Sequence, residues 1–169
     1  MQVIALPGRH RTTEAWMRTV LGGAMLATNG IAHYRHWDAA VEADAEWESR
    51  RLLDATPDLV VAKSLGTVIA SRAFVHHRFR PRNAVLIGTP FGALGPGELA
   101  VMQQFAAGVE TLFIQQDEDP GGPASQLATA LGVARGAVVA VPGSDHLYTD
   151  TAALAAIIRR WAQRSPQVS

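Results

Sequence analysis

The chain has 169 residues, 48% of them hydrophobic, so it is about as long as one average domain and can bury a substantial core. Its fifteen basic and fifteen acidic residues cancel, which argues against a positive field that would gather nucleic acid or an anionic membrane. The absence of cysteine excludes disulfides, thiolate metal sites and cysteine nucleophiles. We therefore expect a single domain over residues 1–169 with neither a nucleic-acid nor a membrane partner.

The first residues predict where the protein is found. The chain opens directly on the apolar run from Val3 to Leu6, without the basic and long apolar segments of a secretion signal. No apolar run approaches the roughly eighteen residues that a membrane-spanning helix needs. These features predict a cytoplasmic protein.

Short β-rich runs alternate with helical stretches along the chain, a rhythm typical of βαβ units around a parallel sheet. Several of these runs are continuously apolar, as expected for interior strands that helices cover on both faces. The predicted strands are Gln2 to Leu6, Ile31 to Trp37, Leu59 to Lys63, Ala84 to Ile87, Thr111 to Gln115 and Ala137 to Val141.

Between the strands, apolar residues recur with the 3.6-residue period of helices. Asp38 and Asp150 stand where two of these helices would be capped, and Trp47 is predicted to pack into the core. The predicted helices are Thr13 to Leu21, Ala39 to Ala55, Leu65 to His76, Gly97 to Ala107, Ala124 to Leu131 and Thr151 to Arg164.

The third predicted strand passes through Ser64 directly into a helix, with the small residues Ala62 and Gly66 two places to either side. In a tight strand-to-helix turn, bulky side chains at those places would collide with neighbouring backbone. The pattern therefore predicts a nucleophile elbow that projects the Ser64 hydroxyl. The alternative is a serine that only caps the helix.

This stretch, Ala62-Lys63-Ser64-Leu65-Gly66, resembles the nucleophile elbow of the α/β-hydrolase superfamily, G-x-S-x-G, with Ala62 where glycine is commoner. A serine hydroxyl is a weak nucleophile, so a histidine must take its proton and a carboxylate must orient that histidine. The family supplies the acid after a later strand and the histidine after the last one.

The acidic loop after the fifth predicted strand resembles the family's acid loop, G-x-x-D followed by a proline before the next helix. That register makes Asp119 the acid, but Gln116 stands where the family usually has glycine, so Asp117 remains an alternative. The last loop, Pro142-Gly143-Ser144-Asp145-His146, resembles the family's G-x-x-H and makes His146 the base. The order Ser64, Asp119, His146 is the family's order.

Acyl transfer also needs amides that bind the oxyanion. The resemblance assigns one to Leu65, directly after the nucleophile. The first loop, from Leu6 to His10, resembles the family's H-G-x loop with proline replacing histidine, which assigns the second amide to Arg9. Lys63, the only lysine, is expected to face away from the Ser64 hydroxyl and to support nearby loops, because adjacent strand residues point to opposite sides.

The resemblance implies a three-layer α/β/α sandwich with a six-stranded parallel sheet in the order 2-1-3-4-5-6, a minimal core without a lid domain. It also implies an open, shallow substrate site with Phe91, Leu94 and Met102 near its edge. No P-loop, dinucleotide fingerprint or metal-ligand pattern is present in the sequence, so neither a cofactor nor a metal is expected.

The expected function is a serine hydrolase that cleaves an ester, thioester or activated amide of a small acyl substrate through an acyl-serine. The alternative is a non-catalytic α/β-hydrolase-like binding or scaffold protein, favoured by the missing lid, the proline in the first loop and the atypical acid loop. A flavodoxin-like nucleotide-binding domain shares the alternation of strands and helices. It lacks the expected phosphate-binding loop after the first strand.

Overall fold

A computed structural model describes residues 1–164, and the predicted domain's last residues, 165–169, lie outside this part. Six parallel strands form one sheet in the order β2-β1-β3-β4-β5-β6, which confirms the predicted topology. Its strands are β1 (Val3–Leu6), β2 (Gly30–Ile31), β3 (Leu59–Lys63), β4 (Asn83–Ile87), β5 (Glu110–Gln116) and β6 (Val138–Val141).

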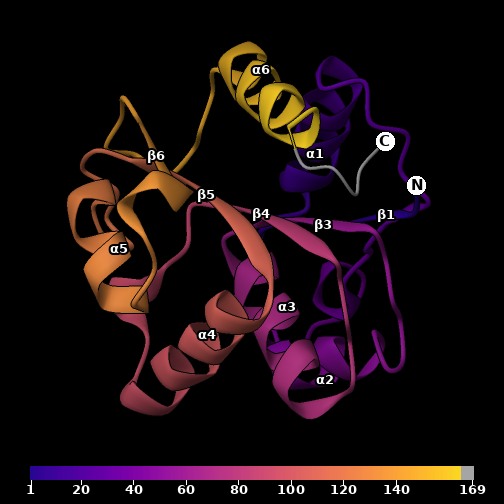
Figure 1. Ribbon diagram of the computed structural model, residues 1–169. Coiled ribbons are helices and arrows are strands. Elements are labelled where there is room, and N and C mark those ends of the chain that lie inside the picture. The colour runs from indigo at the N-terminus through magenta and orange to yellow at the C-terminus, as the bar shows by residue number, and fades with distance from the viewer. Residues whose placement is uncertain (165–169) are drawn as a thin grey trace.

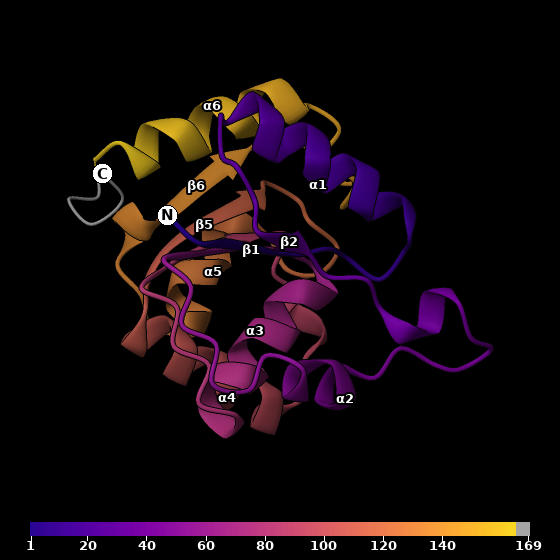
Figure 2. The same cartoon turned by 90° about the vertical axis from the view of Figure 1, so that its right-hand side faces the viewer.

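Helices cover both faces of this sheet and complete the predicted three-layer sandwich. Figures 1 and 2 show α1 and α6 on one face, and α2, α3, α4 and α5 on the other. The helices are α1 (Thr12–Gly23), α2 (Ala45–Arg50), α3 (Leu65–His76), α4 (Pro96–Gly108), α5 (Ala124–Leu131) and α6 (Thr151–Ala162). Three short 3₁₀ turns, η1 (Arg35–Trp37), η2 (Phe91–Ala93) and η3 (Arg135–Ala137), lie in the loops. None of the helices within residues 1–164 is both long and apolar enough to cross a membrane.

The central strands are buried on both faces, and their side chains alternate between two cores. All five residues of β3 and all five of β4 are buried. Val61 and Val85 pack under α1 and α6, whereas their neighbours Val60 and Ala84 pack under the helices of the other face. This double burial explains why these strands read as unbroken apolar runs.

The predicted strand from Ile31 to Trp37 is wrong beyond its first residue. Only Gly30 and Ile31 pair with β1, and residues 35–37 form η1. The rings of the segment leave the sheet to bind another loop: the Tyr34 hydroxyl donates to the Pro7 carbonyl over 2.8 Å, and Trp37 Nε1–H donates to the Arg9 carbonyl over 2.8 Å. These bonds compete with an extended strand and prevail over its β propensity.

The predicted helix from Ala39 to Ala55 is also shorter, since α2 begins only at Ala45. Its N-cap is Asp44, whose side chain accepts from Trp47 N–H, and not Asp38, whose carboxylate pairs with Arg11 and His33. The predicted core position of Trp47 is wrong, because its side chain is 37% exposed. The guanidinium groups of two arginines lie over its ring at 5.4 and 5.5 Å, which suits a surface tryptophan.

Candidate active site

The turn between β3 and α3 has the geometry that the sequence predicts for a nucleophile elbow. Ser64 has φ 50° and ψ −114°, a backbone conformation that is unfavourable for a residue with a side chain. Gly66 makes the turn possible, because a Cβ there would lie 2.1 Å from the Leu6 carbonyl oxygen. The Ser64 side chain makes no capping hydrogen bond to α3, so the helix-cap alternative is wrong.

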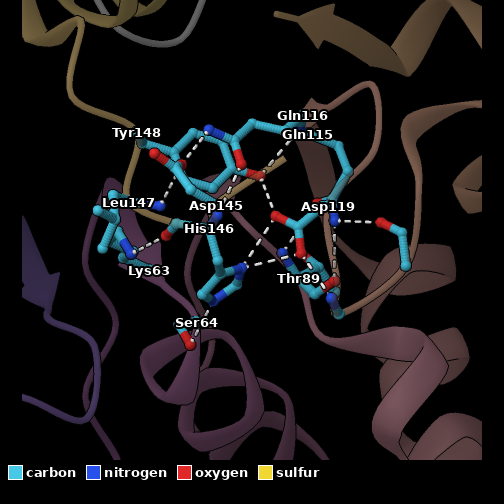
Figure 3. A network of polar contacts seen from close by, with 12 residues as sticks. Lys63, Ser64, Thr89, Gln115, Gln116, Asp119, Asp145, His146, Leu147 and Tyr148 are labelled. Carbon is cyan, nitrogen blue, oxygen red and sulfur yellow. Dashed lines mark hydrogen bonds and ion pairs between the residues drawn. The ribbon is translucent and has the colours of Figure 1, made fainter. Parts of the chain in front are cut away.

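Loops from three strand ends bring Ser64, His146 and Asp119 together (Figure 3). His146 Nε2 lies 2.9 Å from Ser64 Oγ, and Nδ1 lies 2.9 Å from each carboxylate oxygen of Asp119. Asp119 is 3% exposed, whereas the alternative acid Asp117 is exposed and uses its backbone amide to pair with Val141. The geometry therefore selects Asp119 as the carboxylate that holds the imidazole.

Three donors converge on the Asp119 carboxylate. Besides the imidazole, the Gly121 amide donates to Oδ1 and the Tyr148 hydroxyl donates to Oδ2, each over 2.7 Å. Burial raises the pKa of Asp119, but the hydrogen bonds from His146, Tyr148 and Gly121 outweigh it and lower that pKa below the ordinary value. The carboxylate is therefore ionised at neutral pH, opposite the imidazole Nδ1.

The Gln116 side chain holds the backbone of the loop that carries His146. Its Oε1 accepts from the His146 amide over 2.8 Å, and its Nε2 donates to Asp145 Oδ1 over 3.0 Å. A Cβ at Gly143 would lie 2.3 Å from Gln116 Nε2, so the glycine leaves room for this side chain. Sequence reasoning missed this role, although the departure from glycine at position 116 was a signal.

Lys63 holds the same loop from the other side. Its side chain is buried, and Nζ donates to the His146 carbonyl over 3.1 Å while lying 5.4 Å from the ring centres of Trp16 and Tyr148. Burial lowers the pKa of Lys63, and the charges of Asp119 and Asp145 oppose that shift. The contact agrees with the predicted role of Lys63 as a support for nearby loops.

The first loop approaches the elbow through Gly8. A Cβ at Gly8 would lie 3.6 Å from Ser64 Cβ and 3.2 Å from Thr13 Cγ2, so this glycine lets the loop pass close to the serine. Within residues 1–164, neither the Arg9 amide nor the Leu65 amide donates to another residue. No carbonyl of these residues therefore accepts from either of the two predicted oxyanion donors. The Arg9 side chain points to Glu42 instead, in an exposed ion pair of 2.9 Å.

The carbonyls of the same loop are occupied. The Gly8 carbonyl accepts from Thr13 Oγ1 over 3.1 Å, and the Arg9 carbonyl lies 2.8 Å from both His36 Nε2 and Trp37 Nε1. In a trans peptide the N–H points opposite to the C=O, so the Thr13 bond turns the Arg9 amide away from Thr13. The loop thereby presents amides rather than carbonyls on its free side.

Two of the three residues predicted at the edge of the substrate site are in the core. Met102 is 1% exposed and Phe91 is 7% exposed, and both pack in the core on the α3 and α4 face. The ring of Phe91 fills the space beside Gly122, where a Cβ would lie 2.5 Å from it. Leu94 is half-buried and packs against the same core. The large exposed side chain next to His146 is instead Leu147, at 61% exposure.

Comparison with known proteins supports the fold but does not assign the chain to a family. No family model matches the chain, and no curated protein matches it. Among solved structures, a candidate hydrolase of the α/β superfamily from Xanthomonas campestris pv. campestris superposes with a TM-score of 0.63. The two chains are 16% identical, and the match covers 96% of this chain and 97% of that one. The chain therefore has the α/β-hydrolase type of fold over nearly its whole length.

Proposed function

We propose that the protein is a serine hydrolase that cleaves an ester, thioester or activated amide of a small acyl substrate through an acyl-serine intermediate. The observation that carries the proposal is the continuous line of contacts from Ser64 Oγ through both ring nitrogens of His146 to the buried Asp119. In this order, the imidazole can take the proton of the hydroxyl, and the ionised carboxylate can stabilise the imidazolium that forms.

In the acylation step, Ser64 Oγ attacks the substrate carbonyl carbon while His146 Nε2 takes the hydroxyl proton. The C–Oγ bond forms, and the carbonyl electron pair moves to the oxygen. Asp119 stays ionised and stabilises the imidazolium through Nδ1–H. The imidazolium then gives its proton to the leaving alcohol, thiol or amine as the bond to the leaving group breaks.

The developing oxyanion needs hydrogen-bond donors at its own position. The amides of Leu65 and Arg9 are assigned this role, since neither donates to another residue within 1–164 and Gly8 brings their loops together. Deacylation repeats the sequence with water. His146 Nε2 takes a proton from the water, the hydroxide attacks the acyl carbon, and the Oγ–C bond breaks as Ser64 recovers its proton.

The strained backbone favours hydrolysis over a purely structural or binding role. Ser64 and His146 both have positive φ, 50° and 62°, a conformation that is costly for residues with side chains and accumulates at functional sites. The strain therefore supports a catalytic use of this pair.

The test is covalent labelling by a fluorophosphonate followed by peptide mapping. We expect the wild-type protein to be labelled at Ser64 and Ser64→Ala to lose the label. Ser144→Ala removes an exposed serine two residues from His146 and serves as the matched control, which keeps full labelling. Equal labelling of Ser64→Ala, or no labelling of the wild type, would sink the proposal in favour of a binding protein.

A further inference from the structure

The hydroxyl of Tyr148 lies behind the Asp119 carboxylate, on the side away from Ser64 (Figure 3). Tyr148 follows His146 by two residues and is 3% exposed. Its hydroxyl donates to Asp119 Oδ2 over 2.7 Å, and the backbone amide of Gln116 donates to the hydroxyl oxygen over 2.9 Å. One hydroxyl thus links the carboxylate to the end of β5.

The direction of this hydroxyl is fixed from both sides. A backbone N–H can only donate, so the Tyr148 oxygen accepts from Gln116 and its single proton is left for Asp119. An ionised carboxylate can only accept, which leaves the same assignment. Burial and the neighbouring carboxylate raise the pKa of Tyr148, so the phenol keeps its proton at neutral pH.

The carboxylate therefore has a fixed donor on each oxygen. Gly121 N–H binds Oδ1 and Tyr148 O–H binds Oδ2, while His146 Nδ1 lies 2.9 Å from both oxygens. Within residues 1–164, Tyr148 is the only donor to Oδ2 apart from the imidazole. Without the hydroxyl, Oδ1 keeps the Gly121 amide, whereas Oδ2 keeps only its contact with the imidazole.

The ring of Tyr148 has separate contacts that a phenylalanine would keep. Lys63 Nζ lies over the ring, the His146 ring meets it edge-on at 6.0 Å, and Gly88 leaves it space, since a Cβ there would lie 2.8 Å from Tyr148 Cε2. Tyr148→Phe therefore keeps this packing and removes two hydrogen bonds, the one to Asp119 and the one from the Gln116 amide.

We infer that Tyr148 is a positioning residue: its hydroxyl orients the Asp119 carboxylate, which in turn aligns Nδ1–H of His146 and directs Nε2 toward Ser64. The kinetic consequence of this role rests on the proposed hydrolase function. The effect on the hydrogen bond between His146 and Asp119 does not rest on that function, because this bond is present in the protein without substrate.

The experiment compares Tyr148→Phe with Tyr34→Phe. Tyr34, the chain's other tyrosine, also loses a buried hydroxyl bond, but to the Pro7 carbonyl, so it controls for the general effect of such a loss. Proton NMR of the Nδ1–H of His146 is the direct readout. We expect its downfield resonance to shift or broaden beyond detection in Tyr148→Phe and to stay unchanged in Tyr34→Phe.

Kinetics supply the second readout, on an acyl ester that the wild type hydrolyses. We expect kcat of Tyr148→Phe to fall about tenfold, the loss typical of one hydrogen bond to a charged group, with KM unchanged because the hydroxyl does not face the substrate. An unchanged resonance together with an unchanged kcat overturns the inference.

If Tyr148→Phe does not fold, a second measurement tests the inference. Incorporating 3-fluorotyrosine into Tyr34→Phe labels Tyr148 alone and makes its hydroxyl a stronger donor without removing it. The His146 resonance must then move relative to unlabelled Tyr34→Phe, and a fixed resonance overturns the inference. If fluorophosphonate does not label the wild type while the resonance does move, the hydrolase proposal fails and the positioning role of Tyr148 stands.

Discussion

The two sides of the Ser64 site are held in different ways. On the side of the base, polar side chains hold the backbone of His146: Gln116 accepts from its amide, and Lys63 donates to its carbonyl. On the side of the first loop, ring donors hold carbonyls: Tyr34 binds the carbonyl of Pro7, and the rings of residues 36 and 37 bind that of Arg9.

The difference follows from what each side must present. The base side presents two side chains, so its backbone can be fully bonded and its strain at His146 (φ 62°) can be offset by those bonds. The first loop presents backbone amides. The donors that fix it must therefore bind its carbonyls, which point to the opposite side. We conclude that the segment from Tyr34 to Trp37 fixes the backbone of the first loop, as Lys63 and Gln116 fix the backbone of His146.

The largest expected effect comes from the acid on the base side. Asp119→Asn should lower kcat/KM about 10⁴-fold, because the amide can donate toward Nδ1 and favour the wrong tautomer of His146. Asp117→Asn is the matched control on the same loop, and its exposed side chain should leave kcat/KM within about threefold of the wild type. Equal losses in the two variants would contradict the assignment of the acid.

The next effect concerns the contact between the elbow and the first loop. A methyl group at Gly66 would lie 2.1 Å from the Leu6 oxygen and 2.8 Å from the Pro7 oxygen, both backbone atoms that cannot move aside. Gly66→Ala should therefore lower the free energy of unfolding by about 3 kcal/mol or more, measured by urea denaturation.

Gly22→Ala provides the control for that loss. Gly22 lies on the exposed surface of α1, and a Cβ there meets nothing within 4 Å. This substitution should raise the free energy of unfolding by up to about 1 kcal/mol through helix propensity. A small effect at Gly66 as well would show that the first loop can retreat from the elbow.

The sequence predicts the central sheet and the elbow because their signals are local. The strand from Leu59 to Lys63 is an apolar run, as a doubly covered strand must be, and Gly66 is required by the turn itself. The segment from Ile31 to Trp37 is mispredicted for the opposite reason. Its aromatic residues favour a strand in isolation, and only their bonds to a loop about 27 residues away pull them out of the sheet.

The same reasoning separates the predicted site residues from the missed ones. Ser64, Asp119 and His146 follow strand ends at the sheet edge where parallel strands place ligands, so their meeting is a consequence of topology. Gln116 and Tyr148 act through contacts that span 30 and 29 residues, for which no local pattern exists. Phe91 and Met102 were wrong as substrate contacts because both side chains are buried in the core, Phe91 from η2 and Met102 from α4.

A smaller effect is expected when a ring donor that binds the first loop is removed. Trp37→Phe keeps a ring beside Tyr34 but removes the Nε1–H that binds the Arg9 carbonyl, leaving His36 as the remaining donor. We expect kcat to fall about threefold to tenfold, less than the loss of a whole oxyanion donor. Trp161→Phe in α6 is the matched control, and a loss as large there would refute a specific role for Trp37.

The smallest expected effect is the pH dependence of stability that Asp119 confers. Burial alone would raise its pKa, but the hydrogen bonds lower it in the folded state, so folding favours the charged form. This contribution is fully present above the carboxyl's unfolded pKa of about 4 and is lost as the pH falls through the lower folded pKa. In urea denaturation between about pH 5 and pH 2, wild-type stability should fall more steeply than that of Asp119→Asn, by up to about 1.4 kcal/mol per pH unit. Asp117→Asn should retain the wild-type dependence of the free energy of unfolding on pH. If this dependence is the same for the wild type and Asp119→Asn, the charge of Asp119 does not contribute to stability.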